Sequence, residues 1–256
     1  MKKQFVIMIM ALLPMAAVAQ SDDFGLDFSL EAQKKLSKQW SVSLEGEYRS
    51  RNNAKTNDRW SVGLNVDYKV AKWLKASAGY TLLYDNNERI SYYEATDDAV
   101  LDGDAEVGDP KKCAQYWQTR HRFNVSLTAS QKFGNWKFSL RERWQYTYRP
   151  ERTIDRYDVD DEEYEERTYP GMAKHLLRSR LQVEYGVPGT GLSPFANVEV
   201  FNGWSLVKTR YTVGMDYDLS KKHSLGLFYR YQAVHDDTDN EEPDRHLIGF
   251  SYKYKF

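Results

Sequence analysis

Apolar and polar residues alternate along most of this chain, and this pattern limits the folds open to it. In residues 24–32, Phe24, Leu26 and Phe28 stand at every second place, with small or polar residues between them. Side chains on a strand point alternately to its two faces, so a period of two predicts strands with one apolar and one polar face. About eleven segments of roughly ten residues show this pattern, and their length suits a tilted strand that crosses a membrane. They are residues 24–32, 40–48, 60–70, 74–84, 123–129, 136–148, 177–185, 196–200, 211–217, 225–231 and 248–256.

Two folds hide one face of each strand, a membrane β-barrel and a soluble β-sandwich. After residue 19 no stretch approaches the roughly 18 consecutive apolar residues of a membrane helix, and the mean hydropathy of the chain is -0.73. Aromatic residues nevertheless make up 14% of the sequence. Trp or Tyr ends several apolar rows, as in Trp40 with Tyr48 and Trp60 with Tyr68, and bilayer interfaces favour such rings. The sequence therefore predicts an all-β, transmembrane, antiparallel up-and-down β-barrel.

The connections between these segments fall into two length classes that alternate along the chain. Short connections, several of them a Lys-containing turn followed by Trp or His, are predicted at 36–39, 70–72, 133–135, 186–194 and 220–223. Longer connections are predicted at 52–58, 85–116, 150–171 and 235–245, with a brief Asn202-Gly203 turn among them. In outer-membrane barrels the short turns face the periplasm and the longer loops face outward.

The number of strands is the least determined part of this architecture. An all-antiparallel barrel closes only with an even number of strands, and eleven segments do not meet that rule. We expect ten to twelve strands and favour twelve, with RISYYEAT (89–96) as a candidate for a missing strand. The alternatives are one segment too many, or an unusual seam in which residues 24–34 run in the same direction as the last segment.

The first nineteen residues predict export from the cytoplasm. Lys2 and Lys3 precede an apolar run from Phe5 to about Met15, and Ala17-Val18-Ala19 offers a small-x-small cleavage site before Gln20. The apolar run is too short for a transmembrane anchor. We therefore expect residues 1–19 to be a signal peptide, residues 20–256 to form the barrel domain, and the outer membrane of a Gram-negative bacterium to be its location.

The chain ends on SYKYKF, in which Tyr252, Tyr254 and Phe256 alternate with polar residues. A terminal strand of alternating aromatics that ends in Phe resembles the signal read by the barrel assembly machinery of Gram-negative bacteria. The partners expected are that machinery, outer-membrane lipid and lipopolysaccharide. No pattern in the sequence specifies a solute or an oligomeric state.

One stretch of the chain is similar to a known family. DFGLDFSLEAQKKLSKQWSVSLEGEYRSR (23–51), with Lys34, Lys35, Leu36 and Trp40 around its turn, resembles the "domain of unknown function 2490" group of bacterial outer-membrane barrels. In pattern the resemblance covers most of the chain after the signal segment. It implies an outer-membrane barrel and carries no known activity or catalytic residue.

The polar rows would point into the barrel, and their charges are unevenly distributed. The acidic lumen-lining residues predicted from the early strands are Asp27, Glu31, Glu45, Glu47 and Asp67. The basic ones predicted from the later strands are Arg120, Arg122, Arg141, Arg143, Arg178, Arg180, Lys208, Arg210 and Arg230. An arginine wall predicts a pore that favours anions. The alternative is that the two walls pair and fill a narrow lumen, because unpaired buried charges are costly. Glu142 falls in an apolar row, where a bulge or snorkelling could accommodate it.

Several other functions have weak support. The net charge of -1 argues against a nucleic-acid partner, and no spacing predicts a metal site or a cofactor. Acidic stretches at 97–109, 157–166 and 235–242 could bind divalent cations or a basic partner, or could simply be solvated. DGDAEVGD has no glycine at the position where a calcium-binding loop makes its sharp turn. The one cysteine, Cys113, is expected to be a free thiol in the long 85–116 connection.

The remaining alternative is an outer-membrane enzyme that modifies lipids, either a hydrolase or an acyltransferase. Such an enzyme needs a nucleophile beside a base, and the histidines available are His121, His175, His223, His235 and His246. Pairs such as His175 with Ser179 are imaginable across strands, but none stands in a recognisable nucleophile motif. We therefore expect a non-enzymatic, porin-like barrel, acting either as a structural and interaction protein or as a narrow passive channel.

Overall fold

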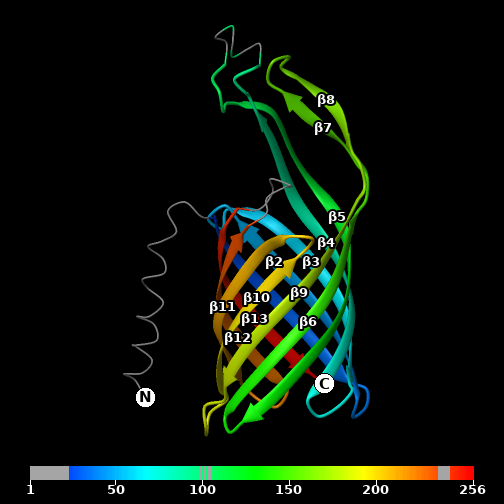
Figure 1. Cartoon of the computed structure of the whole chain (residues 1–256), viewed down its shortest axis with the longest axis vertical. Helices are drawn as coiled ribbons and strands as arrows, with labels where there is room; N and C mark the ends of the chain where they lie inside the picture. The colour runs from blue at the N-terminus through cyan, green and yellow to red at the C-terminus, as the bar shows by residue number, and fades with distance from the viewer. Residues whose placement is uncertain (1–22, 98–99, 101, 103–104, 236–242) are drawn as a thin grey trace, which may run out of the picture.

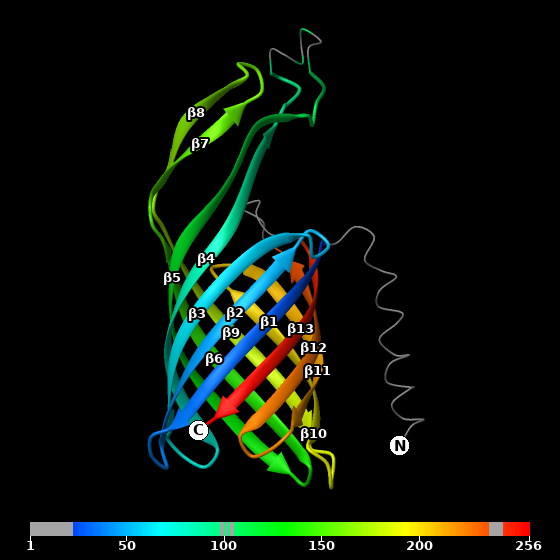
Figure 2. The same ribbon diagram turned by 180° about the vertical axis from the view of Figure 1, so that it is seen from behind.

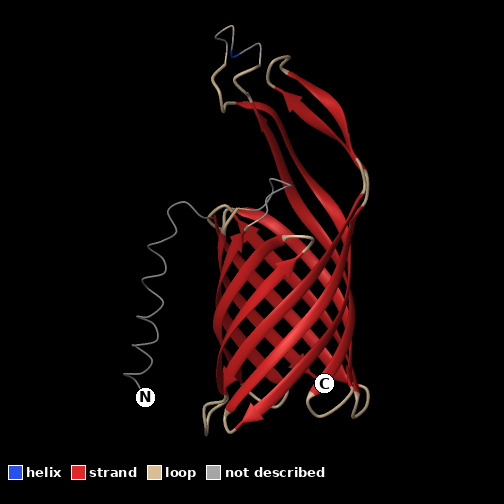
Figure 3. Ribbon diagram, in the orientation of Figure 1, coloured by secondary structure: helices blue, strands red, loops and turns tan. Residues whose placement is uncertain are grey.

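The computed structural model describes residues 23–97, 100, 102, 105–235 and 243–256. The predicted signal peptide, residues 1–19, lies outside this range. Strands make up nearly all of the described chain (Figure 3). Those of the barrel wall are β1 (Asp23–Lys35), β2 (Trp40–Arg51), β3 (Thr56–Lys69), β4 (Leu74–Tyr92), β5 (Pro110–Phe133), β6 (Trp136–Arg149), β9 (Met172–Tyr185), β10 (Leu192–Asn202), β11 (Leu206–Asp218), β12 (His223–Val234) and β13 (Arg245–Lys255). A separate hairpin consists of β7 (Arg152–Asp158) and β8 (Glu163–Tyr169).

In the described part of the chain the wall closes with eleven strands, which lies within the expected ten to twelve but differs from the favoured twelve. Each strand pairs with its neighbour in antiparallel fashion except at one seam, where β1 runs parallel to β13 from Asp23↔Arg245 to Gln33↔Lys255. Figure 2 shows β1 in blue beside β13 in red. In an antiparallel sheet with an odd number of strands, the first and last strands run in the same direction. A single parallel pairing between them therefore closes the barrel. The RISYYEAT segment supplies no extra strand, since its first half, residues 89–92, continues β4.

The outer surface of the wall is apolar and exposed, as the alternation predicts. Leu30, Leu44, Leu64 and Val125 are each half exposed or more, although all are large and apolar. Such a continuous apolar surface indicates a membrane as solvent rather than water. Among the described residues, no helix has the length and apolarity needed to cross a membrane.

The inner surface is polar, with a few aromatic side chains packed on glycines. A Cβ atom at Gly249 would lie 2.0 Å from the ring of Phe228 on the neighbouring β12, so only glycine fits under this ring. The Arg230 guanidinium lies 4.6 Å from the centre of the same ring. An aromatic ring that covers an inward glycine fills the space between strands.

The two ends of the barrel differ, and the predicted alternation of connection lengths holds in part: the connection predicted at 52–58 is a turn of residues 52–55, as short as those at the other end. The short turns at residues 36–39, 70–73, 134–135, 186–191 and 219–222 all lie at the end that also holds Phe256 (Figure 1). In the tightest turn, Gly134 adopts a φ of 59°, which glycine adopts without steric cost. The chain enters the barrel at the opposite end, where Asp23 lies.

Two segments predicted as long loops instead build an arm that rises from the barrel rim. Residues 85–92 extend β4, residues 110–117 extend β5, and the β7–β8 hairpin stands beside them (Figure 1). Cys113 therefore lies on strand β5 rather than in a loop, and it pairs with Ile90 and Tyr157. The sequence does not predict these strands, because their charged residues hide the alternation.

The arm is held together by a small apolar cluster and by one lysine. Ala114, Tyr116 and Ile154 are buried against each other, and Tyr169 packs on them. On the hairpin side, Lys112 donates to Glu165 at 2.9 Å and also forms an ion pair with Asp158. The arm is thus a small sheet outside the membrane, with both its own core and its own ion pairs.

Candidate functional site

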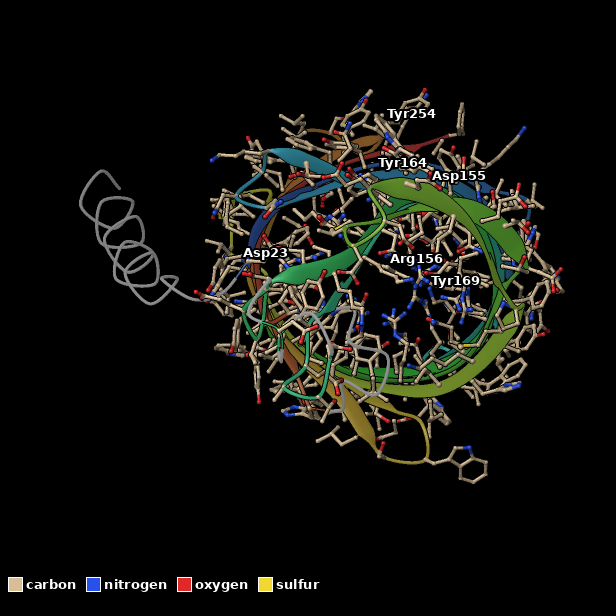
Figure 4. All side chains as sticks on the ribbon, turned by 90° about the horizontal axis from the view of Figure 1, so that it is seen from above. Asp23, Asp155, Arg156, Tyr164, Tyr169 and Tyr254 are labelled. Carbon is tan, nitrogen blue, oxygen red and sulfur yellow. The ribbon has the colours of Figure 1, made fainter. Side chains whose placement is uncertain are left out.

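The interior of the barrel contains a cavity of about 1550 Å³. At the end with the short turns it is lined by residues 36–39 and by Trp73, and at the arm end by Met172, Lys174 and Val234. One cavity therefore reaches from one end of the wall to the other. Figure 4, seen from the arm end, shows nitrogen-bearing side chains reaching into the interior beside an open space.

The nine basic residues predicted to line the lumen all border this cavity: Arg120, Arg122, Arg141, Arg143, Arg178, Arg180, Lys208, Arg210 and Arg230. They come from β5, β6, β9, β11 and β12, whose inward rows therefore form one basic wall. Among the predicted acidic residues, Glu31, Glu45, Glu47 and Asp67 border the cavity as well. Asp27 is buried beside it, where it accepts hydrogen bonds from Arg49 at 3.2 Å and Arg230 at 3.3 Å.

Within the basic wall, one carboxylate joins two arginines. Glu199 on β10 accepts a hydrogen bond from Arg178 at 2.9 Å and another from Arg141. The adjacent Phe201 is almost fully buried, and the guanidinium groups of Arg178 and Arg210 lie 4.4 and 4.7 Å from the centre of its ring. Phe201 and Glu199 thus fix the positions of the arginines around them.

Four guanidinium groups of the wall have no carboxylate partner among the described residues. Arg210 donates to the amide oxygen of Gln232 at 2.8 Å, and Arg122 reaches the hydroxyl of Thr147 at 3.5 Å. Arg143 and Arg180 have neither an amide nor a hydroxyl acceptor. Each also has a buried Nε without a hydrogen-bond partner. Because all four side chains border the cavity, their guanidinium groups can meet an anion or water there.

On the opposite side of the barrel, towards the arm end, the interior is filled. Asp85 forms ion pairs with Arg59 and Arg120, and the side chains of Leu83 and Leu247 are almost completely buried. Only a small void of about 60 Å³ remains among them. The cavity is therefore narrowed on the β1–β4 side and continues along the basic wall.

Sequence reasoning missed some of these residues for two reasons. Glu199 lies between Val198 and Val200 within a predicted segment, so the alternation was sufficient to find it. Arg49, Arg59 and Asp85 lie just beyond the ends of predicted segments, on strands that extend further than the alternation indicated. Their partners were not predictable, because these lie on strands distant in the sequence.

The five histidines each contact a polar or aromatic neighbour. His121 and His223 bond through Nδ1 to the hydroxyls of Tyr80 at 2.8 Å and Tyr252 at 2.6 Å. The remaining three bond or stack with side chains on adjacent strands: His246 with Tyr229, His235 with Thr209, and His175 with Trp144 and Tyr146. In the part of the chain that the structure describes, no group of three or more metal-ligating side chains occurs.

Comparison with known proteins gives the family. The family model for "Protein of unknown function (DUF2490)" matches residues 24–242. The chain belongs to this family. The resemblance noted in residues 23–51 is thereby confirmed, while no curated protein sequence matches the chain.

Solved structures agree on the fold. The β domain of the Bordetella autotransporter BrkA matches with a TM-score of 0.53 at 14% identity, over 92% of this chain and 99% of that one. The translocator domain of the autotransporter NalP from Neisseria meningitidis matches with a TM-score of 0.52 at 9% identity, over 88% and 77%. The NanC porin has a TM-score of 0.46 at 12% identity, over 92% of this chain and all of that one. The two autotransporter domains, with TM-scores above 0.5, show that this member of the family has the fold of an outer-membrane β-barrel.

Proposed function

We propose that this protein is a narrow, passive, non-catalytic channel of the Gram-negative outer membrane that admits small anionic solutes. The observation that carries this proposal is the single cavity that reaches both ends of the barrel along the basic wall. A wet pore lined by guanidinium groups attracts anions and repels cations. A cavity of about 1550 Å³ that extends along the whole barrel would restrict passage to small molecules.

Two alternatives from the sequence have less support. A purely structural barrel would need a lumen filled by paired charges. Several lumen charges are paired, but a cavity of about 1550 Å³ remains along the basic wall. A lipid-modifying enzyme would need a hydroxyl nucleophile beside a base. The hydroxyl of Ser179 is instead bonded to Glu142 at 2.6 Å, and the described histidines bond or stack with other side chains.

Planar-bilayer recording of the refolded protein tests the channel. We expect the wild type to conduct with a preference for anions, and the Arg143→Glu/Arg180→Glu variant to lose or reverse that preference. Arg152→Glu/Arg167→Glu is the matched control, because it changes the charge equally at two exposed positions of the arm. Its selectivity should equal that of the wild type.

Folding is checked in the same samples by the shift in gel mobility on heating. Folded protein that leaves the bilayer silent would rule out the channel. Release of fatty acid from labelled lipid by the wild type would instead establish an enzyme.

A further inference from the structure

One carboxyl group lies on the lipid-facing side of the barrel. Glu142 occupies the outward row of β6 between Leu140 and Trp144, both about half exposed. It is the sixth residue after Trp136 and the sixth before Tyr148, the aromatic residues at the two ends of that row. Glu142 therefore lies half-way across the apolar band, too far from either interface for its short side chain to reach water.

This placement is a regular feature of the wall. The pairing of β6 with β5 and with β9 continues without a register shift through Leu127↔Glu142 and Glu142↔Ser179, so no bulge turns Glu142 inward. Between the two aromatic belts of the described outward rows, Glu142 is the one Asp, Glu, Lys or Arg. A charged or polar group in this position is unfavourable unless another group satisfies it.

The contacts of Glu142 satisfy only part of the carboxyl group. The Ser179 hydroxyl donates to its Oε2 at 2.6 Å, and the described residues provide no partner for Oε1. Around this pair lies a continuous apolar surface of Leu127, Leu140, Trp144, Leu177 and Leu181, each about half exposed. We call these seven residues the Glu142 patch. In a membrane, where lipid gives apolar surfaces no hydrophobic reason to associate, a polar pair within an apolar surface can hold two chains together by hydrogen bonds across the contact.

We infer that the Glu142 patch is the interface of a dimer with a second copy of this chain, packed side by side in the membrane. A two-fold axis along the membrane normal brings the patch against itself, so the surface must be self-complementary. The patch meets this condition, because Oε1 of Glu142 has no partner among the described residues and a hydrogen bond shared between the two copies would satisfy both. Two copies of Glu142 can thus pair with each other, while each Ser179 keeps its bond within its own chain. This inference is independent of the proposed channel.

Cross-linking in native outer membranes tests the position of the interface. With Cys113 replaced by Ser, Glu142→Cys should give a dimer with a short bis-maleimide cross-linker. Leu44→Cys is the matched control, since Leu44 is lipid-facing and equally far from Trp40 and Tyr48, on the distant strand β2. It should give no dimer. Equal cross-linking at both positions, no dimer at either, or a product with a different protein would overturn the inference.

Single-molecule photobleaching of the full chain in vesicles tests the role of the carboxyl group. We expect the wild type to dimerise, Glu142→Leu to weaken dimerisation roughly tenfold through loss of two hydrogen bonds in lipid, and Glu142→Gln to stay close to the wild type. The amide of Gln can also donate and accept. Both substitutions suit a lipid-facing site, so folding should persist. A monomeric wild type, or a Glu142→Leu variant that dimerises equally well, would contradict the inference.

Discussion

At the scale of single residues, the lumen is a set of charges of which some are paired and some are not. Glu199 is bonded to two arginines, whereas Arg143 and Arg180 have no carboxylate partner in the described chain. A paired group contributes to stability, because its loss leaves buried charges uncompensated. An unpaired guanidinium contributes instead to the potential that a solute meets. The two kinds of residue therefore predict different effects when they are changed.

Glu199→Gln should destabilise the barrel and strengthen its preference for anions. Loss of the charged acceptor from Arg141 and Arg178 is expected to lower the free energy of unfolding by about 1–3 kcal/mol. Urea unfolding in lipid vesicles measures this change. Glu184→Gln is the control, because the Glu184–Lys137 pair at 2.9 Å is more exposed. This control should lower the free energy of unfolding by about 0–1 kcal/mol. Equal costs for both variants would show that the Glu199 cluster has no special role.

At the scale of elements, the arm shows how strands continue beyond the barrel. β4 and β5 are long enough to leave the wall, and the β7–β8 hairpin joins β5 through pairing at only Lys112↔Asp158 and Cys113↔Tyr157. Hydrogen bonds from the Lys112 ammonium lower the pKa of the Asp158 and Glu165 carboxyls. The same two hydrogen bonds raise the pKa of Lys112. The attachment of the hairpin therefore depends on charges that pH can remove.

The hairpin should loosen from β5 in acid. With pKa values below the ordinary 3.8 of Asp158 and 4.5 of Glu165, the carboxylates stabilise the contact fully above pH 4.5 and lose this effect as pH falls through the lowered values. Lys112, with its pKa raised above 10.5, loses its effect only at more alkaline pH. Hydrogen exchange of residues 152–158, corrected for intrinsic rates, should show protection at pH 7 that falls at pH 2.

In the Lys112→Gln variant, the hydrogen-exchange protection of residues 152–158 should already be reduced at pH 7. Amides of the barrel strands β2 and β3 serve as the control and should keep their protection in both proteins. A hairpin whose protection is the same at pH 7 and pH 2 would contradict the role of these ion pairs.

At the scale of the whole molecule, the parallel seam decides where the two ends of the barrel chain lie. Phe256 lies with the short turns and Asp23 lies at the arm end (Figures 1 and 2). An antiparallel barrel with an even number of strands would place both at the same end. If the short turns face the periplasm, as in other outer-membrane barrels, the arm and Asp23 both face the outside.

Cysteine labelling of intact cells tests this orientation. In a Cys113→Ser background, a membrane-impermeant maleimide should label Trp204→Cys, because Trp204 is fully exposed in the β10–β11 turn at the arm end. Lys72→Cys, in the β3–β4 turn, should react only after the outer membrane is permeabilised. The reverse pattern would show that the barrel is inserted the other way round.

The sequence by itself determined the strands, their two faces and the division into short and long connections. These features are local, because successive side chains on a strand point to opposite faces, and so the inward places of Arg143 and Glu47 followed from their neighbours. Only the tertiary structure decided the number of strands, the seam and the partners of each charge. The pairing of β1 with β13, or of Glu199 with Arg141, joins segments far apart in the chain, and no local pattern specifies such a register. Charged residues in the arm also hide the alternation, which is why the sequence does not predict its strands.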